Sequence, residues 1–382
     1  VGPEGSWSLI DNRRSKVFTY DSNGSLLFAF GDTGTQKGNI TAPGTTRYSG
    51  LNIGLIAASN TVVKDCSAEG EFTGIDDNCG GFCGCVFKNV SDVTLDNCDA
   101  KFTMTFGASG KNVGGIIGAT QAPNTVVRNC EAEGDMHVNA NIDQVGGVVG
   151  FSDTPATGLL IEKCSYSGYM GKKDHNRSIY AGIIGYLAGA NSTVRNCWSA
   201  GEIDGANHSV GGICGTTLPE TVIEYCYSTM TITAGHAVGG ILGRAENHKD
   251  LTQSSEDIFN NVLRKSIAWN PSIISRRKPL NTAKNHSCGS LVGKTVKFNT
   301  MEDCVRRADI VLDLYDNPDL DTPFDQENSN TTTALIWNYD AQYYCPYHGK
   351  AAAADATVSS VAKSLGWDET VWDLSGELPK LK

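Results

Sequence analysis

Apolar and polar positions along the chain follow two short phrases that alternate over most of its length. The first phrase is an apolar residue, usually two glycines, two aliphatic residues and a final Gly, and it recurs at intervals of 28 to 35 residues. Clear copies end at Gly84, Gly118, Gly150, Gly185, Gly215 and Gly243, and weaker copies end at Gly54 and Gly293. Each copy is short and bounded by Gly, Asn or Asp, which predicts a strand beside a bend.

The second phrase is an apolar pair, two polar residues and Cys, and its Cys recurs at intervals of 29 to 34 residues. The six members are Cys66, Cys98, Cys130, Cys164, Cys197 and Cys226. Beyond each Cys, small residues alternate with polar or large ones, which is the period of a strand. We expect the small set to face inward with Cys: Ala68, Ala100, Ala132, Ser199 and Ser228. We expect the other set to face outward: Ser67, Asp99, Glu131, Trp198 and Tyr227.

The repeated unit has about 30 residues and cannot bury its apolar side alone, so the units must stack. The sequence therefore predicts an all-β parallel β-helix, or β-solenoid, of about seven coils spaced about 4.8 Å apart. We expect the doubled glycines to take backbone conformations closed to other residues and to let the coils pack closely. The cysteines should form an internal structural column of thiols. A local disulfide is expected, if anywhere, between Cys79 and Cys83 or Cys85.

The period weakens toward both ends of the chain, which predicts caps over the exposed coils. We divide the chain into an N-terminal β cap (1–48), the solenoid (49–245), an irregular last coil with an insertion (246–299) and a C-terminal α+β cap (300–382). From Thr300 to Tyr315, apolar residues at helical spacing follow a capping-box pattern, which predicts a helix. A second helix is predicted from Asp355 to Leu365, with Gly366 as its end.

The Gly-Gly-aliphatic-aliphatic-Gly phrase after an Asn-Cys strand end resembles the GLUG-motif repeat of bacterial surface and secreted proteins. The likeness covers about residues 50 to 243 and implies a cell-surface or secreted protein, with no catalytic residues to transfer. Residues 17–31, with Gly34, Gly38 and Pro43, resemble one blade of an NHL-type β-propeller. One blade cannot close a propeller, so we expect this segment to act as a cap on the solenoid; the alternative is that the chain begins partway through a longer one.

Composition supports this architecture and narrows the function. Gly accounts for 43 of 382 residues, and the net charge of -11 with a pI near 5.1 argues against nucleic acid as a partner. No stretch approaches the 18 consecutive apolar residues of a membrane span. The chain begins with Val1, so we expect either a processed chain or part of a longer one.

Candidate chemistry is sparse. The aromatic residues Tyr166, Tyr169, Trp198 and Tyr227 fall on three successive coils, and we expect them to form an outward strip on which sugar rings can stack. Asp316, Asp319 and Asp321 could offer oxygen ligands to Ca²⁺, although the stretch lacks the Gly and Glu of an EF-hand and reads better as a solvated turn. Cys345 and His348 have half of a zinc-site spacing. No nucleotide-binding or hydrolase motif is present, so we expect no cofactor and assign no catalytic residue.

The sequence thus favours a secreted or cell-surface binding or adhesion protein whose extracellular partner is a glycan or a host or cell-surface protein. One alternative is a polysaccharide lyase or glycoside hydrolase on the same scaffold, with outward carboxylates such as Glu131 and Glu133 as its acids and bases. Another alternative is a structural spacer that binds nothing. The oligomeric state is left open.

Overall fold

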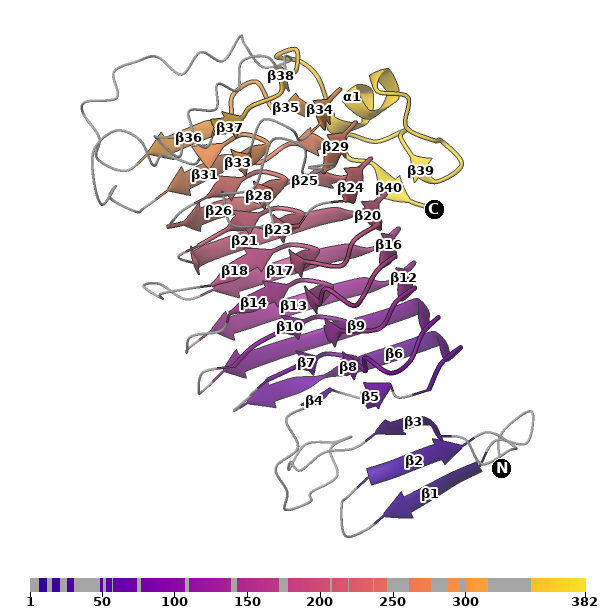
Figure 1. The fold of residues 1–382 in the computed structure, drawn as a ribbon. Coiled ribbons are helices and arrows are strands. Elements are labelled where there is room, and N and C mark those ends of the chain that lie inside the picture. The colour runs from indigo at the N-terminus through magenta and orange to yellow at the C-terminus, as the bar shows by residue number, and fades with distance from the viewer. Residues whose placement is uncertain are drawn as a thin grey trace, which may run out of the picture.

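The structure is a computed structural model in which parallel strands stack coil upon coil (Figure 1). It describes residues 7–11, 16–20, 26–30, 49–50, 53–56, 58–73, 77–106, 110–138, 143–171, 178–206, 208–218, 220–235, 237–245, 261–275, 288–295, 300–314 and 345–382. The predicted fold class, an all-β parallel solenoid with a small mixed segment at its C-terminal end, is confirmed.

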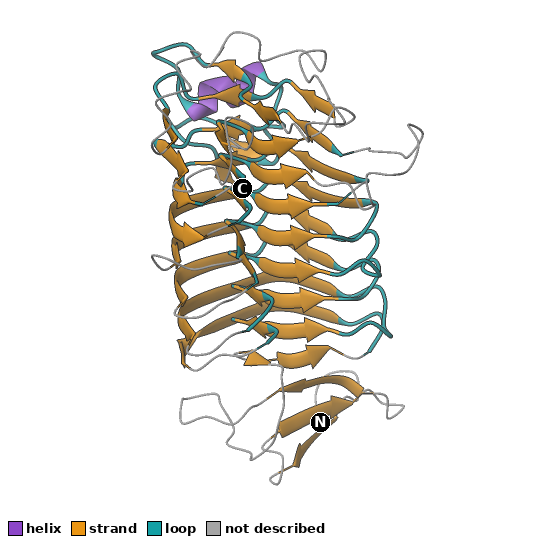
Figure 2. Cartoon of the chain, turned by 60° about the vertical axis from the view of Figure 1, so that its left-hand side comes forward, coloured by secondary structure: helices purple, strands orange, loops and turns teal. Residues whose placement is uncertain are grey.

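Three strand systems, seen from the side in Figure 2, run along the stack. Sheet A has 12 strands within the described residues, in the order β1 (Trp7–Asp11), β2 (Lys16–Tyr20), β3 (Leu26–Phe30), β5 (Ile53–Ile56), β8 (Cys83–Val86), β11 (Ile117–Thr120), β15 (Val149–Ser152), β19 (Ile184–Leu187), β23 (Cys214–Thr217), β28 (Leu242–Ala245), β33 (Val292–Thr295) and β37 (Cys345–Tyr347). Sheet B has eight described strands, β4 (Ser49–Gly50), β7 (Cys79–Gly80), β10 (Val113–Gly114), β14 (Gln144–Gly146), β18 (Ile179–Ala181), β22 (Val210–Gly211), β27 (Val238–Gly239) and β32 (Cys288–Gly289). One strand of sheet B belongs to each coil, which agrees roughly with the expected number of coils.

The third system, sheet C, carries the Cys phrase and the residues after it. Its strands are β6 (Val62–Thr73), β9 (Thr94–Phe106), β12 (Val126–Arg128), β13 (Glu131–Val138), β16 (Leu160–Glu162), β17 (Ser165–Gly171), β20 (Ser192–Arg195), β21 (Trp198–Ala206), β24 (Thr221–Glu224), β25 (Tyr227–Ser228), β26 (Thr231–Ala234), β29 (Val262–Arg264), β30 (Ile267–Ala268), β31 (Ser272–Ser275), β34 (Thr300–Glu302), β35 (Val305–Arg306), β36 (Val311–Leu314) and β38 (Lys350–Ala351). Along β9, buried and exposed residues alternate as the period-2 pattern predicted, with Cys98, Ala100 and Met104 in the core.

Two of the bends in the coils are made by residues with left-handed backbone, one inside sheet C beside the column cysteines and one between sheets A and C. The residue before each column cysteine, or before Ser266 in its place, has φ between 49° and 55°: Asp65, Asn97, Asn129, Lys163, Asn196, Tyr225, Lys265 and Asp303. A second corner uses Asn60, Asp92, Asn124, Gly158, Asn191 and Glu220 with φ from 55° to 70°. Asn and Asp dominate both sets because they tolerate this conformation better than other residues with a Cβ.

The doubled glycines have a different role from the one predicted. Where the structure describes them, none has a φ in the left-handed region, so the expectation that they turn the chain is wrong. A Cβ on Gly114 would strike the carbonyl oxygen of Ile117, and a Cβ on Gly115 would strike that of Gly147 and lie 2.8 Å from the Cβ of Ala132. Close packing between coils therefore requires glycine at these positions, which confirms the prediction that the doubled glycines let the coils pack closely.

The N-terminal end of the stack is met by an antiparallel meander. Strands β1, β2 and β3 pair antiparallel, and β3 pairs antiparallel with β5 of the first coil at Ala29 and Leu55. This arrangement covers one edge strand of sheet A, as a cap must.

The helix predicted from Thr300 is wrong. Residues 300–302 form β34, which pairs in parallel register with β29, and Val305 pairs with Ile267 in the next pair of strands. The Thr-Met-Glu-Asp-Cys run that ends at Cys304 is another copy of the Cys phrase, and the packing of its coil overrides the capping-box pattern. Residues 261–275, expected to be irregular, also keep the parallel register with the preceding coil.

The second predicted helix is confirmed as α1 (Val358–Ser364). Thr357 and Ser360 form a capping box at its start, and Gly366 with φ of 71° follows its end. After it, β39 (Trp372–Asp373) and β40 (Lys380–Leu381) pair antiparallel. We refer to residues 352–382 as the C-terminal clasp, because Figure 1 shows this segment against the side of the last coils rather than beyond them.

Candidate functional site

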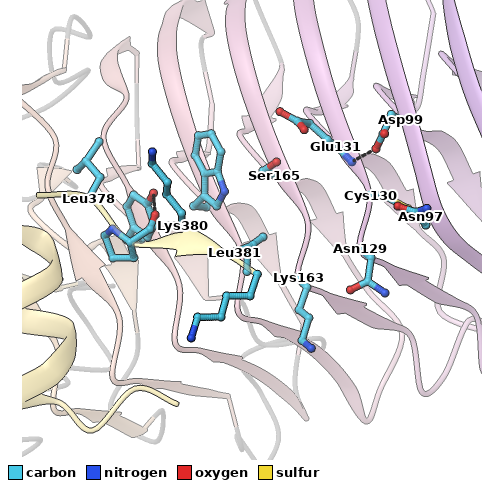
Figure 3. Close-up of a pocket in the computed structure, with 14 residues that line it drawn as sticks. Asn97, Asp99, Asn129, Cys130, Glu131, Lys163, Ser165, Leu378, Lys380 and Leu381 are labelled. Atoms are coloured by element: carbon cyan, nitrogen blue, oxygen red, sulfur yellow. Dashed lines mark hydrogen bonds between the residues drawn. The ribbon is translucent and has the colours of Figure 1, made fainter. Parts of the chain in front are cut away.

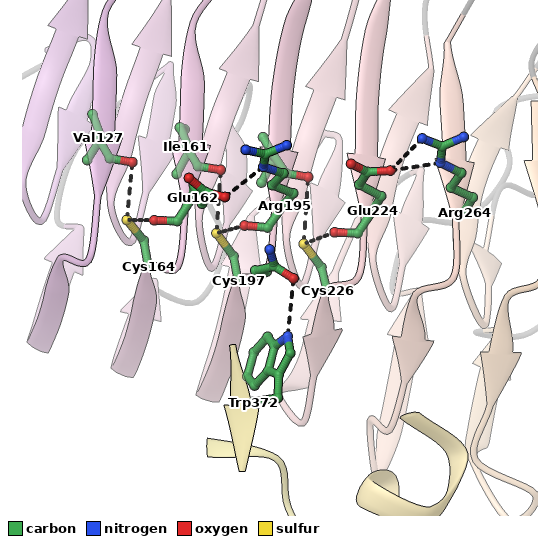
Figure 4. A network of polar contacts seen from close by, with 12 residues as sticks. Val127, Ile161, Glu162, Cys164, Arg195, Cys197, Glu224, Cys226, Arg264 and Trp372 are labelled. Carbon is green, nitrogen blue, oxygen red and sulfur yellow. Dashed lines mark hydrogen bonds and ion pairs between the residues drawn. The ribbon is translucent and has the colours of Figure 1, made fainter. Parts of the chain in front are cut away.

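The predicted cysteine column lies inside the solenoid and is structural. Each buried thiol donates to the carbonyl two residues before it and to a carbonyl of the previous coil, as Cys197 does to Arg195 at 3.2 Å and Ile161 at 3.8 Å (Figure 4). The column runs through Cys66, Cys98, Cys130, Cys164, Cys197 and Cys226, then Ser266 in the same place, then Cys304.

Burial makes these thiols unreactive. It raises the pKa of the Cys304 thiol to about 12 and that of Cys164 well above its usual value. No disulfide joins the twelve cysteines whose side chains the structure describes, so the expected pairing of Cys79 with Cys83 or Cys85 is wrong. The column offers packing rather than redox or nucleophilic chemistry.

A ladder of alternating charge runs beside the column, two residues before each thiol. Successive strands place Lys64, Asp96, Arg128, Glu162, Arg195, Glu224, Arg264 and Glu302 in register. Ion pairs join Arg128 to Asp96 at 3.0 Å, Arg195 to Glu162 at 2.8 Å and Arg264 to Glu224 at 2.7 Å (Figure 4). The Arg128 guanidinium holds the pKa of the Asp96 carboxyl below its usual range. Each pair ties one coil to its neighbour.

The aromatic strip predicted on the outer face is only partly there. Tyr166 is 0% exposed, because it pairs with Ala132 and Ser199 in the inward set, and its hydroxyl donates to the carbonyls of Gly134 and Tyr169. Its outward placement is therefore wrong. Tyr169 is half-buried and lies beside His137, with ring centroids 5.7 Å apart.

Trp198 and Tyr227 do face outward, in one column, but the C-terminal clasp covers part of them. Their rings stack at 6.0 Å with an interplanar angle of 11°. Tyr227 is only 2% exposed because Trp367 and Trp372 pack on its ring, and its hydroxyl donates to the carbonyl of Pro379 at 2.8 Å. An open strip across all four aromatic residues is thus absent.

The clasp holds to the solenoid through a second apolar cluster. Tyr227, Ile267 and Val305 on the solenoid pack with apolar residues of α1 and with Trp367 and Trp372. Two indole N–H groups extend this contact to the corners of the coils. Trp372 donates to the Asn196 side chain at 3.1 Å, and Trp367 donates to the Lys265 carbonyl at 2.9 Å.

A pocket of about 520 Å³ opens where the last residues of the clasp meet the outer face of the coils (Figure 3). We call it the tail groove. One row of its lining follows the outward column, with Asp99, Glu131, Ser165 and Trp198 on successive coils, and Tyr227 beyond them. A second row follows the corner residues Asn97, Asn129 and Lys163, and residues 378–382 form the remaining wall.

The tail groove brings an aromatic surface together with carboxylate, amide and ammonium groups, a combination that can bind a ring carrying hydroxyl groups. Trp198 is half-buried and offers an aromatic surface, while Asp99, Glu131 and Asn129 are exposed and Lys163 is half-buried. Its volume is in the range of small-ligand pockets. Sequence reasoning found Trp198 and Tyr227, and it missed the corner residues and the tail, which approach each other only through the fold.

The remaining sequence candidates contribute nothing to this site. Asp316, Asp319 and Asp321 lie outside the described residues. His348 is buried, and its pKa is lowered to about 4 by desolvation and by the nearby Arg306 charge. Among the described residues no group of three or more His, Cys, Asp or Glu is placed to hold a metal ion. No helix within them has the length and apolar character needed to cross a bilayer. Glu133, a carboxylate of the enzymatic alternative, pairs with Lys101 at 2.9 Å outside the groove.

The fold is that of a parallel β-solenoid protein, and a comparison with known protein families finds one motif within it. Residues 206–233 match the GLUG motif, which confirms the repeat resemblance for that coil. A solved structure from Bacteroides ovatus, described as a candidate immunoglobulin A1 protease, is distantly similar: TM-score 0.45 and 16% identity over 85% of this chain and 87% of that chain. No curated protein gives a significant match. The resemblance to a propeller blade and to bacterial surface proteins stays a prediction.

Proposed function

We propose that the protein is a secreted or cell-surface binding protein that recognises a glycan in the tail groove. The observation that carries this proposal is the half-buried Trp198 ring beside carboxylate, amide and ammonium side chains on successive coils. Apolar faces of sugar rings stack on indoles, and their hydroxyl groups both donate to carboxylates and accept from amines.

Glycan-array screening followed by calorimetry with the best glycan tests this proposal. Trp198→Ala is expected to weaken binding by at least about tenfold, because the ring supplies the stacking surface. Tyr186→Ala is the matched control, since Tyr186 is a half-buried aromatic residue that packs on Phe151 at 5.7 Å in sheet A, away from the groove. Thermal unfolding of both variants checks the fold. If no glycan on a broad array binds the wild-type protein, the proposal is wrong.

An enzymatic function is the second candidate, and one observation favours it. Asp99 and Glu131 lie in register on adjacent coils in the groove, whose backbones are about 4.8 Å apart, so that two carboxylates border one ligand site as they do in glycosidases. The Asp99 carboxylate already accepts from the backbone N–H of Glu131 at 3.2 Å. Incubation with neutral and acidic polysaccharides, followed by assay for reducing ends and unsaturated products, tests it. Release of product by the wild type and not by Glu131→Gln would support an enzyme.

A further inference from the structure

The stacked outward column is interrupted at one position inside the tail groove. Tyr227, Trp198, Ser165 and Glu131 follow one another in register, and the Tyr227 ring stacks on one side of the Trp198 ring. On the other side the next coil carries Ser165, which is 5% exposed and lines the groove, and its hydroxymethyl group is too small to cover an indole. The outward column therefore dips by one coil between the Trp198 ring and the Glu131 carboxylate, and we call this dip the slot.

The slot lies at the closed end of the groove. Toward the C-terminal coils the column continues into Tyr227, which is 2% exposed and tied to Pro379 of the clasp. Toward the N-terminal coils it continues into Glu131 and Asp99, which are exposed. Figure 3 shows Ser165, Glu131 and Asp99 in line, leading away from the clasp. A linear ligand that runs along the coils can extend past Asp99, but it must stop at Trp198.

The charges around the groove select against a strongly charged ligand. Glu131 and Asp99 line the open arm, and they would repel the carboxylates or sulfates of a polyanion lying along it. Lys163 at the corner beside Ser165, with Lys380 and Lys382 of the clasp, would repel a polycation. A neutral, hydroxyl-rich chain can hydrogen-bond to both sets of side chains without placing like charges together.

We propose that the tail groove binds the terminal unit of a neutral oligosaccharide end-on. The last ring inserts over Ser165 against the free side of the Trp198 indole, and the following units lie along Glu131 and Asp99. This inference rests on the proposed glycan-binding function and adds to it the ligand's charge, the end that is recognised and the residue that admits it.

Filling the slot provides the decisive variant. Ser165→Trp continues the aromatic stack into the space of the terminal ring and is expected to weaken binding at least about thirtyfold. Ser67→Trp is the control in the same outward column, measured with a probe of about three units that ends at Asp99. Ser67 is in register with Asp99, lies outside the groove and is exposed, whereas Ser165 is 5% exposed. Its affinity should stay within about twofold of the wild type. Thermal unfolding of both variants confirms that they fold.

The probes are neutral gluco-, manno-, galacto- and xylo-oligosaccharides of increasing length, with oligogalacturonates as the anionic set. Since coils are about 4.8 Å apart, affinity for a neutral probe should rise until the chain spans Trp198 to Asp99, at about three or four units, and then level off per mole of chain. Recognition of internal units would instead give affinity that keeps rising with chain length.

The outcomes separate the inference from the proposed function. If no probe or array glycan binds, both fail. If glycans bind but Ser165→Trp leaves the affinity unchanged, or oligogalacturonates bind as tightly as neutral chains, or affinity keeps rising with length, the end-on neutral site is wrong while glycan binding stands. The inference is supported if neutral chains bind more tightly than oligogalacturonates, if affinity levels off with chain length, and if Ser165→Trp loses affinity while Ser67→Trp does not.

Discussion

Each coil turns at corner residues whose backbone is left-handed, and their side chains stack as well. Asn97 has φ of 54°, and its amide donates to the Asp65 carboxylate of the previous coil at 2.8 Å. Asn129 has the same conformation and donates to Asp96 at 2.7 Å. The Asn-Cys phrase is thus explained by its two residues: Asn makes the bend and the stacking bond, and Cys fills the core behind it.

This conformation predicts an inverted order of stability at the corner. Asn97→Ala should lower the free energy of unfolding by about 1–2 kcal/mol. Asn97→Gly should lower it less, because the Cβ of Ala is strained in the left-handed region and Gly has no Cβ. At Thr103, an exposed residue of the same strand β9 without a positive φ, Gly should be worse than Ala. Denaturant unfolding of the four variants measures this, and a more stable Ala than Gly variant at residue 97 would refute the argument.

At the scale of strands, the alternating charge ladder gives neighbouring coils complementary partners. Each charge between Lys64 and Glu302 faces the opposite sign on both neighbouring coils, and three of the contacts are ion pairs. The pattern was available in the sequence, since aligning the Cys phrases puts Lys64, Asp96, Arg128 and Glu162 in one column. The ladder was not predicted, because the two residues before each Cys were treated only as polar and their charges were not compared between coils.

Reversing one charge on the ladder tests its contribution. Arg195→Glu would place a third carboxylate between those of Glu162 and Glu224, and it should lower stability by about 1–2 kcal/mol at low salt. The loss should shrink in about 1 M NaCl, where the Debye length is short. Lys88→Glu makes the same change of net charge at an exposed turn and should have little effect. Equal losses for the two variants would mean that net charge, rather than the ladder, is responsible.

For the whole molecule, the sequence predicted what repeats and failed where a contact occurs once. The coils, the inward cysteines and the capped helix α1 follow from periodicity and local capping. The inward position of Tyr166 breaks the small-residue pattern of its column, and nothing local marks it. The covering of Tyr227 depends on Pro379, which is 152 residues away. The tail groove exists only because the clasp returns to the side of the stack, so its corner residues and tail could not be found from spacing.

The clasp itself should be separable from the solenoid, because stacked coils draw their stability mainly from their neighbours. Trp372 is 0% exposed and packs on Trp367 at 5.0 Å, so Trp372→Ala should destabilise the docked clasp by about 3–5 kcal/mol. Trypsin should then cut after Lys363 and Lys380 much faster while the solenoid resists, and Tyr227 and Trp198 should become accessible to quenchers. Leu378→Ala, at a side chain 44% exposed, is the control and should leave the digestion rate nearly unchanged. Loss of the whole fold in Trp372→Ala, seen as one cooperative transition at lower temperature, would instead make the clasp an integral part of the stack.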